Sequence, residues 1–413
     1  MDGLVQEYAE LSLESWILMN TFQTKMCHTI VGLSILALPI SWIVMPGVGS
    51  AYRALTIMLY LLFALIVIRS NGKINIYKET IALVSCWIVY TVLVVISTLF
   101  SPSSDRVVES IFGYGLVMLT AIVFSVCLPE TTGQWLDRIW LITGVIWILL
   151  FFTSGQNILQ FSTRVSLVLL GNRTDPNEYV GALIVPACLM AYQIVKPCKF
   201  QWKLGATLGI GVSVYIAFLA GSRGGLLALL IGIVMTFLTS SKLSIRRIIV
   251  LSIFSIGLIY FVLYGILPML SEELVTRFTI ESIISTGGSD RTALWTQAWD
   301  NFKSCNIWRM LFGYGGYGAD FMNKTMHNQI IQQLVDFGLV GMICYLVLIL
   351  LAYLQIRKHS RRYLGAFFGM MAMSMSITMG PSYKPLWIFL MMGFVIPKGN
   401  GEYDVRNARD VSQ

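Results

Sequence analysis

Long apolar runs recur along this chain of 413 residues, and they constrain its fold more than any motif does. The run at residues 80–100 contains no charged side chain, and similar runs follow it with only short polar connections. Hydrophobic residues make up 56% of the chain and charged residues 12%, compared with roughly 25% charged residues in soluble domains. Charge at the centre of a bilayer is costly, so crossing the hydrocarbon core requires this shortage. The sequence predicts an all-α polytopic membrane protein.

We expect about twelve transmembrane helices, because an apolar helix of roughly 20 residues crosses a bilayer. The last predicted span is short, and residues 156–170 are apolar enough for a re-entrant or interfacial segment. Little chain remains for a soluble domain, so we expect one membrane domain. The predicted spans cover residues 28–46, 52–69, 80–100, 107–128, 136–153, 178–195, 204–221, 223–240, 246–268, 333–355, 363–379 and 384–397.

Lys and Arg collect in every second connection, which predicts the orientation of the spans because short basic loops remain in the cytoplasm. The connection at residues 129–138 contains Glu130, Asp137 and Arg138, and departs from this pattern without reversing it. The basic connections also explain the net charge of +8, so we expect no nucleic-acid partner. Their residues are Arg69, Lys73 and Lys78; Lys196, Lys199 and Lys203; Lys242, Arg246 and Arg247; and Arg357, Lys358, Arg361 and Arg362.

An even number of spans places both termini in the cytoplasm and the remaining polar clusters on the opposite side of the membrane. The start of the chain has no basic residues ahead of an apolar stretch, so it does not resemble a cleavable signal. The expected parts are a cytoplasmic segment at 1–27, transmembrane helices one to nine at 28–268, a large extracytoplasmic loop with short helices at 269–332, helices ten to twelve at 333–397 and a cytoplasmic tail at 398–413.

The segment Ala-Gly-Ser-Arg-Gly-Gly at residues 220–225 lies between two apolar runs and leaves no room for an aqueous loop. An arginine at membrane depth is a functional-site hypothesis by default. The glycines permit a tight turn, and a guanidinium can bind a diphosphate through two parallel hydrogen bonds. We therefore expect Arg223 to bind an anion. The alternative is an arginine whose side chain only extends to the outer headgroups.

A second arginine follows Gly-Gly-Ser-Asp at residues 287–290. Ser289 and Asp290 are candidate N-caps, so we expect Arg291 in the first turn of an extracytoplasmic helix. A cation there opposes the helix dipole, and a bound anion would relieve the mismatch. Taken alone, Arg291 could equally be an ordinary exposed residue.

His327 is the histidine that lies at a predicted outer membrane edge, since His359 lies in a basic cytoplasmic loop and His28 begins the first span. A neutral imidazole at this edge could accept a proton from an attacking hydroxyl, oriented by Asn328 or Gln329. Asn328 is also a candidate for contacting the substrate. The alternative is an ordinary interfacial histidine.

The polar segment at residues 171–179 lies on the same predicted side. Its Asp-Pro-Asn sequence is a turn signal, and we expect Asp175 or Asn177 to cap the following helix. Arg173 and Glu178 remain candidates for contacting sugar or phosphate.

The stretch Gly-Tyr-Gly-Gly-Tyr-Gly at residues 313–318 lacks the flanking strand and helix and the Lys-Ser/Thr ending of a nucleotide-binding loop. A flexible loop that brings Tyr314 and Tyr317 to sugars fits better than ATP binding. The seven cysteines are scattered and are expected as small core residues. No His, Cys and Asp set has metal-ligand spacing, so we expect neither a metal nor a cofactor.

These residues together resemble the O-antigen ligase and O-antigen polymerase superfamily of bacterial membrane glycosyltransferases. The resemblance is carried by Gly-Ser-Arg-Gly-Gly at 221–225, by Asp290-Arg291, and by His327-Asn328 followed after nine residues by Gly-x-x-Gly at 338–341. The last spacing is the most specific signal. The layout of twelve spans with a large late outer loop also matches.

The resemblance implies that Arg223 and Arg291 bind the diphosphate of an undecaprenyl-linked oligosaccharide and that His327 activates the acceptor hydroxyl as a general base. It implies a metal-independent, inverting glycosyltransferase of the bacterial inner membrane, with its active site on the periplasmic or extracellular side. The implied partners are the lipid-linked donor, an acceptor glycan or glycolipid, the bilayer and other polysaccharide-assembly proteins.

The acceptor remains open within this family. A polymerase joins one lipid-linked repeat chain to another, whereas a ligase transfers the chain to lipid A core or to a protein; we favour the polymerase. A flippase or transporter with Arg223 as a substrate gate is a more distant alternative. It is disfavoured because no acidic residue stands clearly within a span and no half-to-half repeat is evident.

Overall fold

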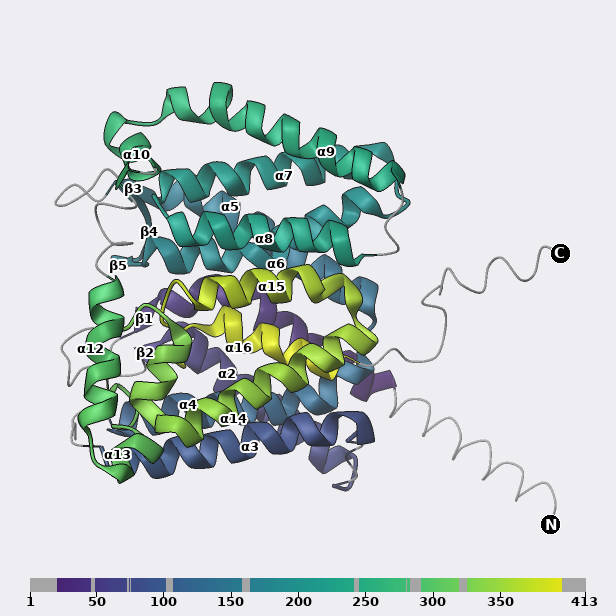
Figure 1. Cartoon of the computed structure of the whole chain (residues 1–413). Helices are drawn as coiled ribbons and strands as arrows, with labels where there is room; N and C mark the ends of the chain where they lie inside the picture. Colours follow the sequence, from purple (N-terminus) through teal and green to yellow (C-terminus); the bar gives the residue numbers. More distant parts are fainter. Residues whose placement is uncertain are drawn as a thin grey trace, which may run out of the picture.

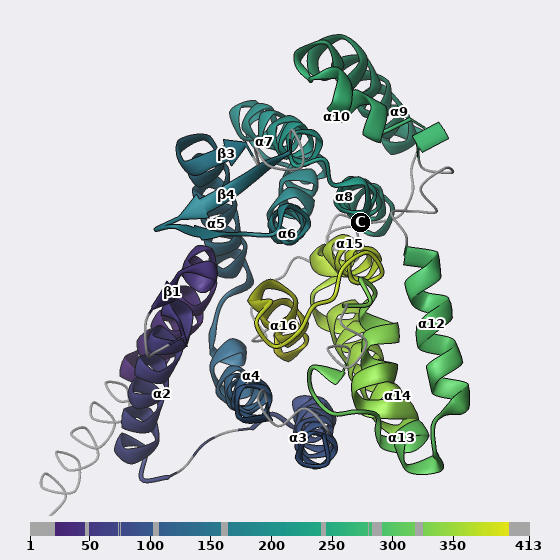
Figure 2. The same cartoon turned by 90° about the vertical axis from the view of Figure 1, so that its left-hand side faces the viewer.

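The computed structural model describes residues 21–45, 49–72, 74, 76–101, 107–157, 164–240, 245–279, 281–282, 291–318 and 325–395. Its long helices run side by side, and short helices and strands gather at one end of this array, on the left in Figure 1. Seen from that end, α2 (Ala51–Arg69) and α12 (Arg291–Ser304) lie on opposite flanks (Figure 2). The predicted class, a mainly helical polytopic membrane protein, is confirmed.

Seven helices of the described part are long and apolar enough to cross a membrane, while the predicted count of twelve stays a prediction. Besides α2, the seven are α3 (Lys78–Leu99), α4 (Val107–Cys127) continued by η3 (Leu128–Glu130), α5 (Gly133–Ser154), α6 (Pro176–Val195), α7 (Phe200–Leu219) and α14 (Gln329–His359). The array also contains helical residues 21–36, η1 (Leu38–Trp42), α8 (Arg223–Thr239), α9 (Ile245–Tyr260), η4 (Phe261–Ile266), η5 (Leu267–Met269), η7 (Arg361–Tyr363), α15 (Leu364–Ser374), α16 (Lys384–Leu390) and η8 (Met391–Phe394).

Glycines bring α8 and α15 into close backbone contact at the centre of the array. A β-carbon on Gly369 would lie 3.0 Å from the carbonyl oxygen of Ala228 and 3.1 Å from the α-carbon of Gly232. Small residues at helix crossings are typical of membrane proteins, where close van der Waals packing holds helices together. Large apolar side chains instead cover the outside, such as Ile68 at 71% exposed and Val108 at 79%. This surface suits contact with lipid rather than with water.

The connections that the sequence predicts to be cytoplasmic lie together at one end of the array. The hydroxyl of Tyr77 donates to Glu130 Oε1 (3.2 Å), and the hydroxyl of Tyr363 donates to Asp137 Oδ1 (2.8 Å). The acidic connection at 129–138 therefore lies at the same end as the basic connections around it, as expected.

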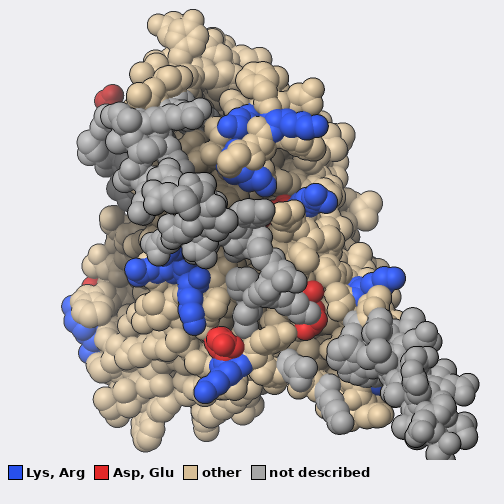
Figure 3. Space-filling model, turned by 90° about the vertical axis from the view of Figure 1, so that its right-hand side faces the viewer, with Lys and Arg blue, Asp and Glu red and all other residues tan. Residues whose placement is uncertain are grey.

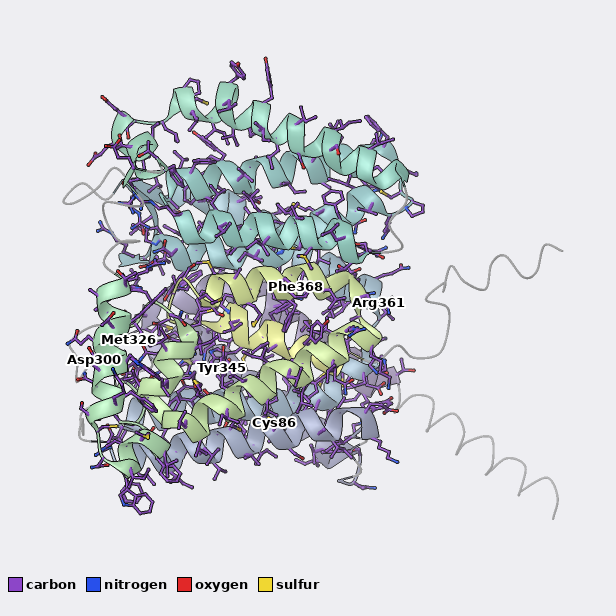
Figure 4. The ribbon with its side chains drawn as sticks, in the orientation of Figure 1. Cys86, Asp300, Met326, Tyr345, Arg361 and Phe368 are labelled. Atoms are coloured by element: carbon purple, nitrogen blue, oxygen red, sulfur yellow. The ribbon has the colours of Figure 1, made fainter. Side chains whose placement is uncertain are left out.

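Basic side chains are spread over this same end, which faces the viewer in Figure 3. Arg361 lies there, at the opposite end of the array from Asp300 and Met326 (Figure 4). The orientation rule requires basic connections to share one end, and those predicted to be cytoplasmic do so. The side of the membrane on which each end lies stays a prediction.

The opposite end carries two small antiparallel sheets. Strand β1 (Val44–Met45) pairs with β2 (Gly49–Ser50). A second sheet has the order β3-β4-β5, with Gly155 opposite Leu167 and Val168 opposite Arg173. The described part of the apolar segment at 156–170 is thus mostly strand rather than a further helix. The strands of the second sheet are β3 (Gly155–Asn157), β4 (Val165–Leu169) and β5 (Asn172–Arg173).

The stretch between α9 and α14 supplies short helices to this same end, namely α10 (Glu272–Arg277), α12 and α13 (Ile307–Phe312). Helix α14 is interrupted at Gly338, where φ is +66°. A β-carbon there would collide with the backbone of Leu311, so glycine is required by both the conformation and the contact. The predicted span at 333–355 therefore lies in a longer helix, and the residues before Gly338 form a separate, polar helical segment.

Candidate active site

The segment around Arg223 forms the tight turn that its glycines predict. Helix α7 ends at Leu219, Gly221 has φ +57°, and α8 begins at Arg223. Ser222 caps α8 through a hydrogen bond from the Gly225 amide to its Oγ (3.2 Å). Arg223 therefore stands in the first turn of a long helix, where unpaired amides and the helix dipole favour a bound anion.

The guanidinium of Arg223 is only partly satisfied by the protein. Its Nη2 donates to the hydroxyl of Ser282 (2.8 Å). Its Nε and Nη1 are buried and have no hydrogen-bond acceptor among the described residues. The Nε of Arg277, the last residue of α10, is also buried and has no acceptor among the described residues. Buried cationic donors without partners are costly, which indicates that a ligand completes them.

Arg164 joins these two arginines, just ahead of strand β4. Its Nε donates to the carbonyl oxygen of Ala220 (2.8 Å), and its Nη2 donates to Asn177 Oδ1 (3.3 Å). A β-carbon on Gly221 would lie 3.0 Å from Arg164 Cγ and 3.3 Å from Arg277 Nε. Burial, followed by the charge of Arg277, lowers the pKa of Arg164. Gly221 thus lets two guanidinium side chains pack onto the turn that precedes Arg223.

Arg291 reaches the other side of the same turn from α12. The described part of α12 begins at Arg291, and the candidate caps Ser289 and Asp290 lie outside the described residues. A β-carbon on Gly224 would lie 3.9 Å from Arg291 Nη1. Burial lowers the pKa of Arg291 and the charge of Arg223 adds to this, while Asp175 acts in the opposite direction.

Arg164, Arg223, Arg277 and Arg291 together form what we call the arginine cluster. Its members repel one another, because like charges at short range disfavour the charged state. Guanidinium groups keep their charge in proteins, so the cluster concentrates positive charge at this place, which would suit an anion.

His327 lies next to this cluster, half-buried, just before α14. Its backbone is left-handed (φ +49°), and its amide donates to Thr378 Oγ1 (3.1 Å). Burial and then the charge of Arg291 lower the pKa of the imidazole, and Asp175 partly opposes them. The imidazole is therefore neutral near pH 7, which is the form that can accept a proton. This is the state required of a general base.

Asn328, next to His327 in the chain, caps α14. Its Oδ1 accepts hydrogen bonds from the amides of Ile330 (3.0 Å) and Ile331 (3.2 Å), which caps α14. Gln329 accepts from the Met379 amide (2.6 Å). These contacts fix the backbone that carries His327, so both residues orient it through the chain rather than through its ring.

A cavity of about 240 Å³ opens beside His327. Asp175, Glu178, Tyr317 and Asp336 contribute to its wall. The other lining residues are Ser110, Tyr114, Thr325, Gln329, Gln332, Ile377, Thr378, Gly380, Pro381 and Ser382. His327 thus lies between the arginine cluster and a polar cavity.

Two of the predicted contact residues, Glu178 and Tyr317, line this cavity. Glu178 Oε2 accepts from Trp42 Nε1 (2.9 Å), and the hydroxyl of Tyr317 donates to Glu109 Oε1 (3.1 Å). Arg173 instead is exposed on strand β5 and lies outside both the lining of the cavity and the contacts of the arginine cluster.

The glycine-rich loop is packed, contrary to the expected flexible loop. The Tyr314 amide donates to the carbonyl oxygen of Val335 (3.0 Å), and the Gly316 amide donates to Thr98 Oγ1 (3.0 Å). The Tyr314 ring lies 5.3 Å below the guanidinium of Arg309, away from the cavity lining. The glycines permit close backbone contact with α3, α4 and α14, and only Tyr317 of the two tyrosines reaches the cavity.

Sequence reasoning missed Arg164 and Arg277. Both lie in connections predicted to be on the same side as Arg223, which was the available signal. Neither stands in a recognisable motif, and their role depends on packing against Gly221. Within the described residues, no group of three or more His, Cys, Asp or Glu side chains comes together as a metal site.

Comparison with known proteins gives a family for this arrangement. A family model described as O-antigen ligase matches residues 208–346, a segment that contains Arg223, Arg291 and His327. No curated protein matches the chain.

Proposed function

From the chain's membership of the O-antigen ligase and polymerase superfamily, we propose that it is a surface polysaccharide polymerase. It transfers a glycan from undecaprenyl diphosphate to a sugar hydroxyl of a second lipid-linked repeat. The reaction takes place on the periplasmic or extracellular side of the bacterial inner membrane.

The observation that carries this proposal is the arginine cluster with unpaired, buried donors beside a neutral His327. A diphosphate supplies the missing acceptors and the missing negative charge. Two helix N-termini, those of α8 and α12, add their dipoles at the same place. This combination suits a diphosphate better than a single carboxylate, because it supplies donors from several directions.

The proposed chemistry is a single displacement at the anomeric carbon. The acceptor hydroxyl loses its proton to His327, and its oxygen bonds to the anomeric carbon. The bond from that carbon to the diphosphate oxygen breaks, and the electron pair leaves with undecaprenyl diphosphate. The arginine cluster stabilises the charge that develops on the leaving group, and configuration inverts at the carbon. The guanidinium groups thus perform the charge neutralisation, so the proposed reaction is metal-independent.

A ligase is the second candidate, because the matched family model carries that description. It would use the same donor site and the same base, with lipid A core or a protein as the acceptor. Supplying purified lipid-linked repeats alone separates the two candidates, since a polymerase forms longer chains from them and a ligase does not.

The test is reconstitution of the full chain in liposomes with undecaprenyl-diphosphate-linked repeats, followed by separation of the products by size. We expect the natural chain to form a ladder of products of increasing length. The amount of this product should fall about a hundredfold or more for His327→Ala. His359→Ala, a histidine at the opposite end of the array, should leave the ladder intact. An unchanged ladder for His327→Ala would remove that residue from its proposed role.

A further inference from the structure

The start of α6 meets the turn that carries Arg223. Helices α6, α7 and α8 contact one another and lie together when the array is seen from the end that carries the sheets (Figure 2). The sequence predicts Asp175 or Asn177 as the cap of α6, and the cap is Asp175, whose Oδ1 accepts from the Asn177 amide (2.7 Å). The side chain of Asn177 is therefore not the cap, and it reaches beyond its own helix.

The side-chain amide of Asn177 links three parts of the site. Its Oδ1 accepts from the hydroxyl of Ser222 (2.8 Å) and from Arg164 Nη2 (3.3 Å). Its Nδ2 donates to Asp175 Oδ1 (2.9 Å). Ser222 is buried and caps α8, so a bond to its hydroxyl fixes the start of the helix that begins at Arg223. One amide thus joins α6, the cap of α8 and a member of the arginine cluster.

This amide also lies between opposite charges. Burial lowers the pKa of Arg164 and of Arg291, and the charge of Asp175 acts against this in both, so the carboxylate is within electrostatic reach of the cluster. Within the described residues, however, no ion pair joins Asp175 to either arginine, and none includes a member of the arginine cluster. Asn177 instead bonds the carboxylate on one side and Arg164 on the other.

An asparagine suits this position because it has both an acceptor and donors and carries no charge. It can satisfy a guanidinium and a carboxylate at the same time. A carboxylate in its place could accept the same bonds from Ser222 and Arg164, but it would cancel one positive charge of the cluster. The charge that the cluster presents to a ligand therefore depends on Asn177 being neutral.

We propose that Asn177 is a positioning residue of the arginine cluster: its uncharged amide holds Arg164 and the cap of α8 in place and leaves the charge of the cluster to the donor diphosphate. The inference rests on the proposed function in taking the cluster as the diphosphate site. Asn177 is not among the described residues that line the cavity beside His327, so it acts through Arg164 and Ser222.

The test places a carboxylate on Arg164 without changing the net charge of the chain. In the double variant Asp175→Asn with Asn177→Asp, the two side chains exchange places, and the cap of α6 is kept because asparagine caps a helix about as well as aspartate. The affinity of the full chain in lipid nanodiscs for undecaprenyl diphosphate should fall by about tenfold or more, because the moved carboxylate pairs with Arg164. The melting temperature should be unchanged or higher, since a charge-assisted bond replaces a neutral one.

Asp175→Asn with Asn172→Asp is the matched control. It keeps the same net charge but moves the carboxylate to β5, where the side chain of Asn172 bonds the carbonyl oxygen of Leu170 (3.3 Å) and not the cluster. This control should bind undecaprenyl diphosphate no more weakly than the natural chain.

Equal affinities of the exchanged variant and its control overturn the inference. A fall in affinity that is matched by a fall in melting temperature also overturns it, because a purely structural asparagine would give that result. Failure of the natural chain to bind the diphosphate overturns both the inference and the proposed function. The expected loss of affinity together with no product ladder from lipid-linked repeats would contradict the proposed function alone and leave the role of Asn177 standing.

Discussion

Two buried arginines at opposite ends of the helix array show how the same side chain serves different purposes. Arg362, at the end predicted to face the cytoplasm, forms an ion pair with Asp137 (2.7 Å), and both side chains are less than 10% exposed. The hydroxyl of Tyr363 donates to the same carboxylate oxygen. Arg223, at the other end, has one hydroxyl partner and two buried nitrogen atoms without an acceptor in the described chain.

The difference separates a structural charge from a functional one. A buried ion pair whose two charges balance within the chain holds helices together and has little left to offer a charged ligand. A guanidinium with two buried, unpaired nitrogen atoms, repelled by Arg277 and Arg291, leaves part of its hydrogen-bonding capacity for a substrate. The free energy that such a site costs in folding is recovered when an anion binds.

The largest expected effect is on transfer when the incomplete arginine is removed. Arg223→Ala should reduce the rate of chain transfer by about a hundred- to thousandfold, the range seen when one preorganised donor to a developing charge is lost. Its thermal stability should be unchanged or higher, because a repelled cation has gone. The measurement pairs a product ladder with a thermal unfolding curve.

Arg357→Ala is the control for this first prediction, since Arg357 is exposed at the opposite end. It should affect neither quantity. A large drop in the stability of Arg223→Ala would show that this arginine is structural after all.

The second prediction concerns the complete ion pair. Arg362→Ala should lower the free energy of unfolding by about 3 kcal/mol, because it leaves the Asp137 carboxylate buried and unpaired. Activity per folded molecule should not change. Adding Asp137→Ala to this variant should restore part of the stability in a denaturation experiment. An additive loss in the double variant would mean that the pair contributes little.

The third prediction uses two glycines that share a left-handed backbone. Gly221 has φ +57° and packs against the arginine cluster, whereas Gly72 has φ +75° and has no atom within 4 Å of an added β-carbon. Alanine at either position should cost about 1–2 kcal/mol of stability through the backbone. Gly221→Ala should also displace Arg164 and lower transfer about tenfold, since small misplacements are costly in catalysis. Equal transfer rates for the two variants would contradict the packing role.

The smallest effect is on the pH dependence of transfer. Because the pKa of His327 is lowered, the neutral base persists as the pH falls through the ordinary histidine value near 6.5, and kcat/KM should decline only below it. Removing the charge of Arg291 should raise that pKa, so in Arg291→Ala the acid limb of the residual activity moves to higher pH, by up to about one unit. If the acid limb of kcat/KM in the natural chain has its midpoint at or above pH 6.5, His327 with a lowered pKa is not the base.

Much of the helix layout could be predicted, because apolar runs and their boundaries are local properties. The expected span at 107–128 corresponds to α4 and η3 (Val107–Glu130), and the expected helix after Arg291 corresponds to α12, whose described part begins at that residue. The secondary structure of the segment at 156–170 was harder to predict, because short buried strands and apolar helices have similar compositions.

The candidate site was predictable where a residue type was unusual for its position. Arg223 stood out because it interrupts apolar sequence, and His327 because histidines are few in this chain. Arg164 and Arg277 did not stand out, since arginines in polar connections are common. Their contribution depends on how the sheet and α10 pack over Gly221, which is a tertiary property that no local pattern encodes.

We propose above all that the incomplete arginines hold the diphosphate of the donor. The most direct measurement is the affinity of the full chain in nanodiscs for undecaprenyl diphosphate, compared among the natural chain, Arg223→Gln and Arg357→Gln. We expect saturable binding that weakens by about tenfold or more for Arg223→Gln, the loss expected when a charge-assisted hydrogen bond is removed. Binding should be unchanged for Arg357→Gln. Equal affinity in all three proteins would contradict the proposal.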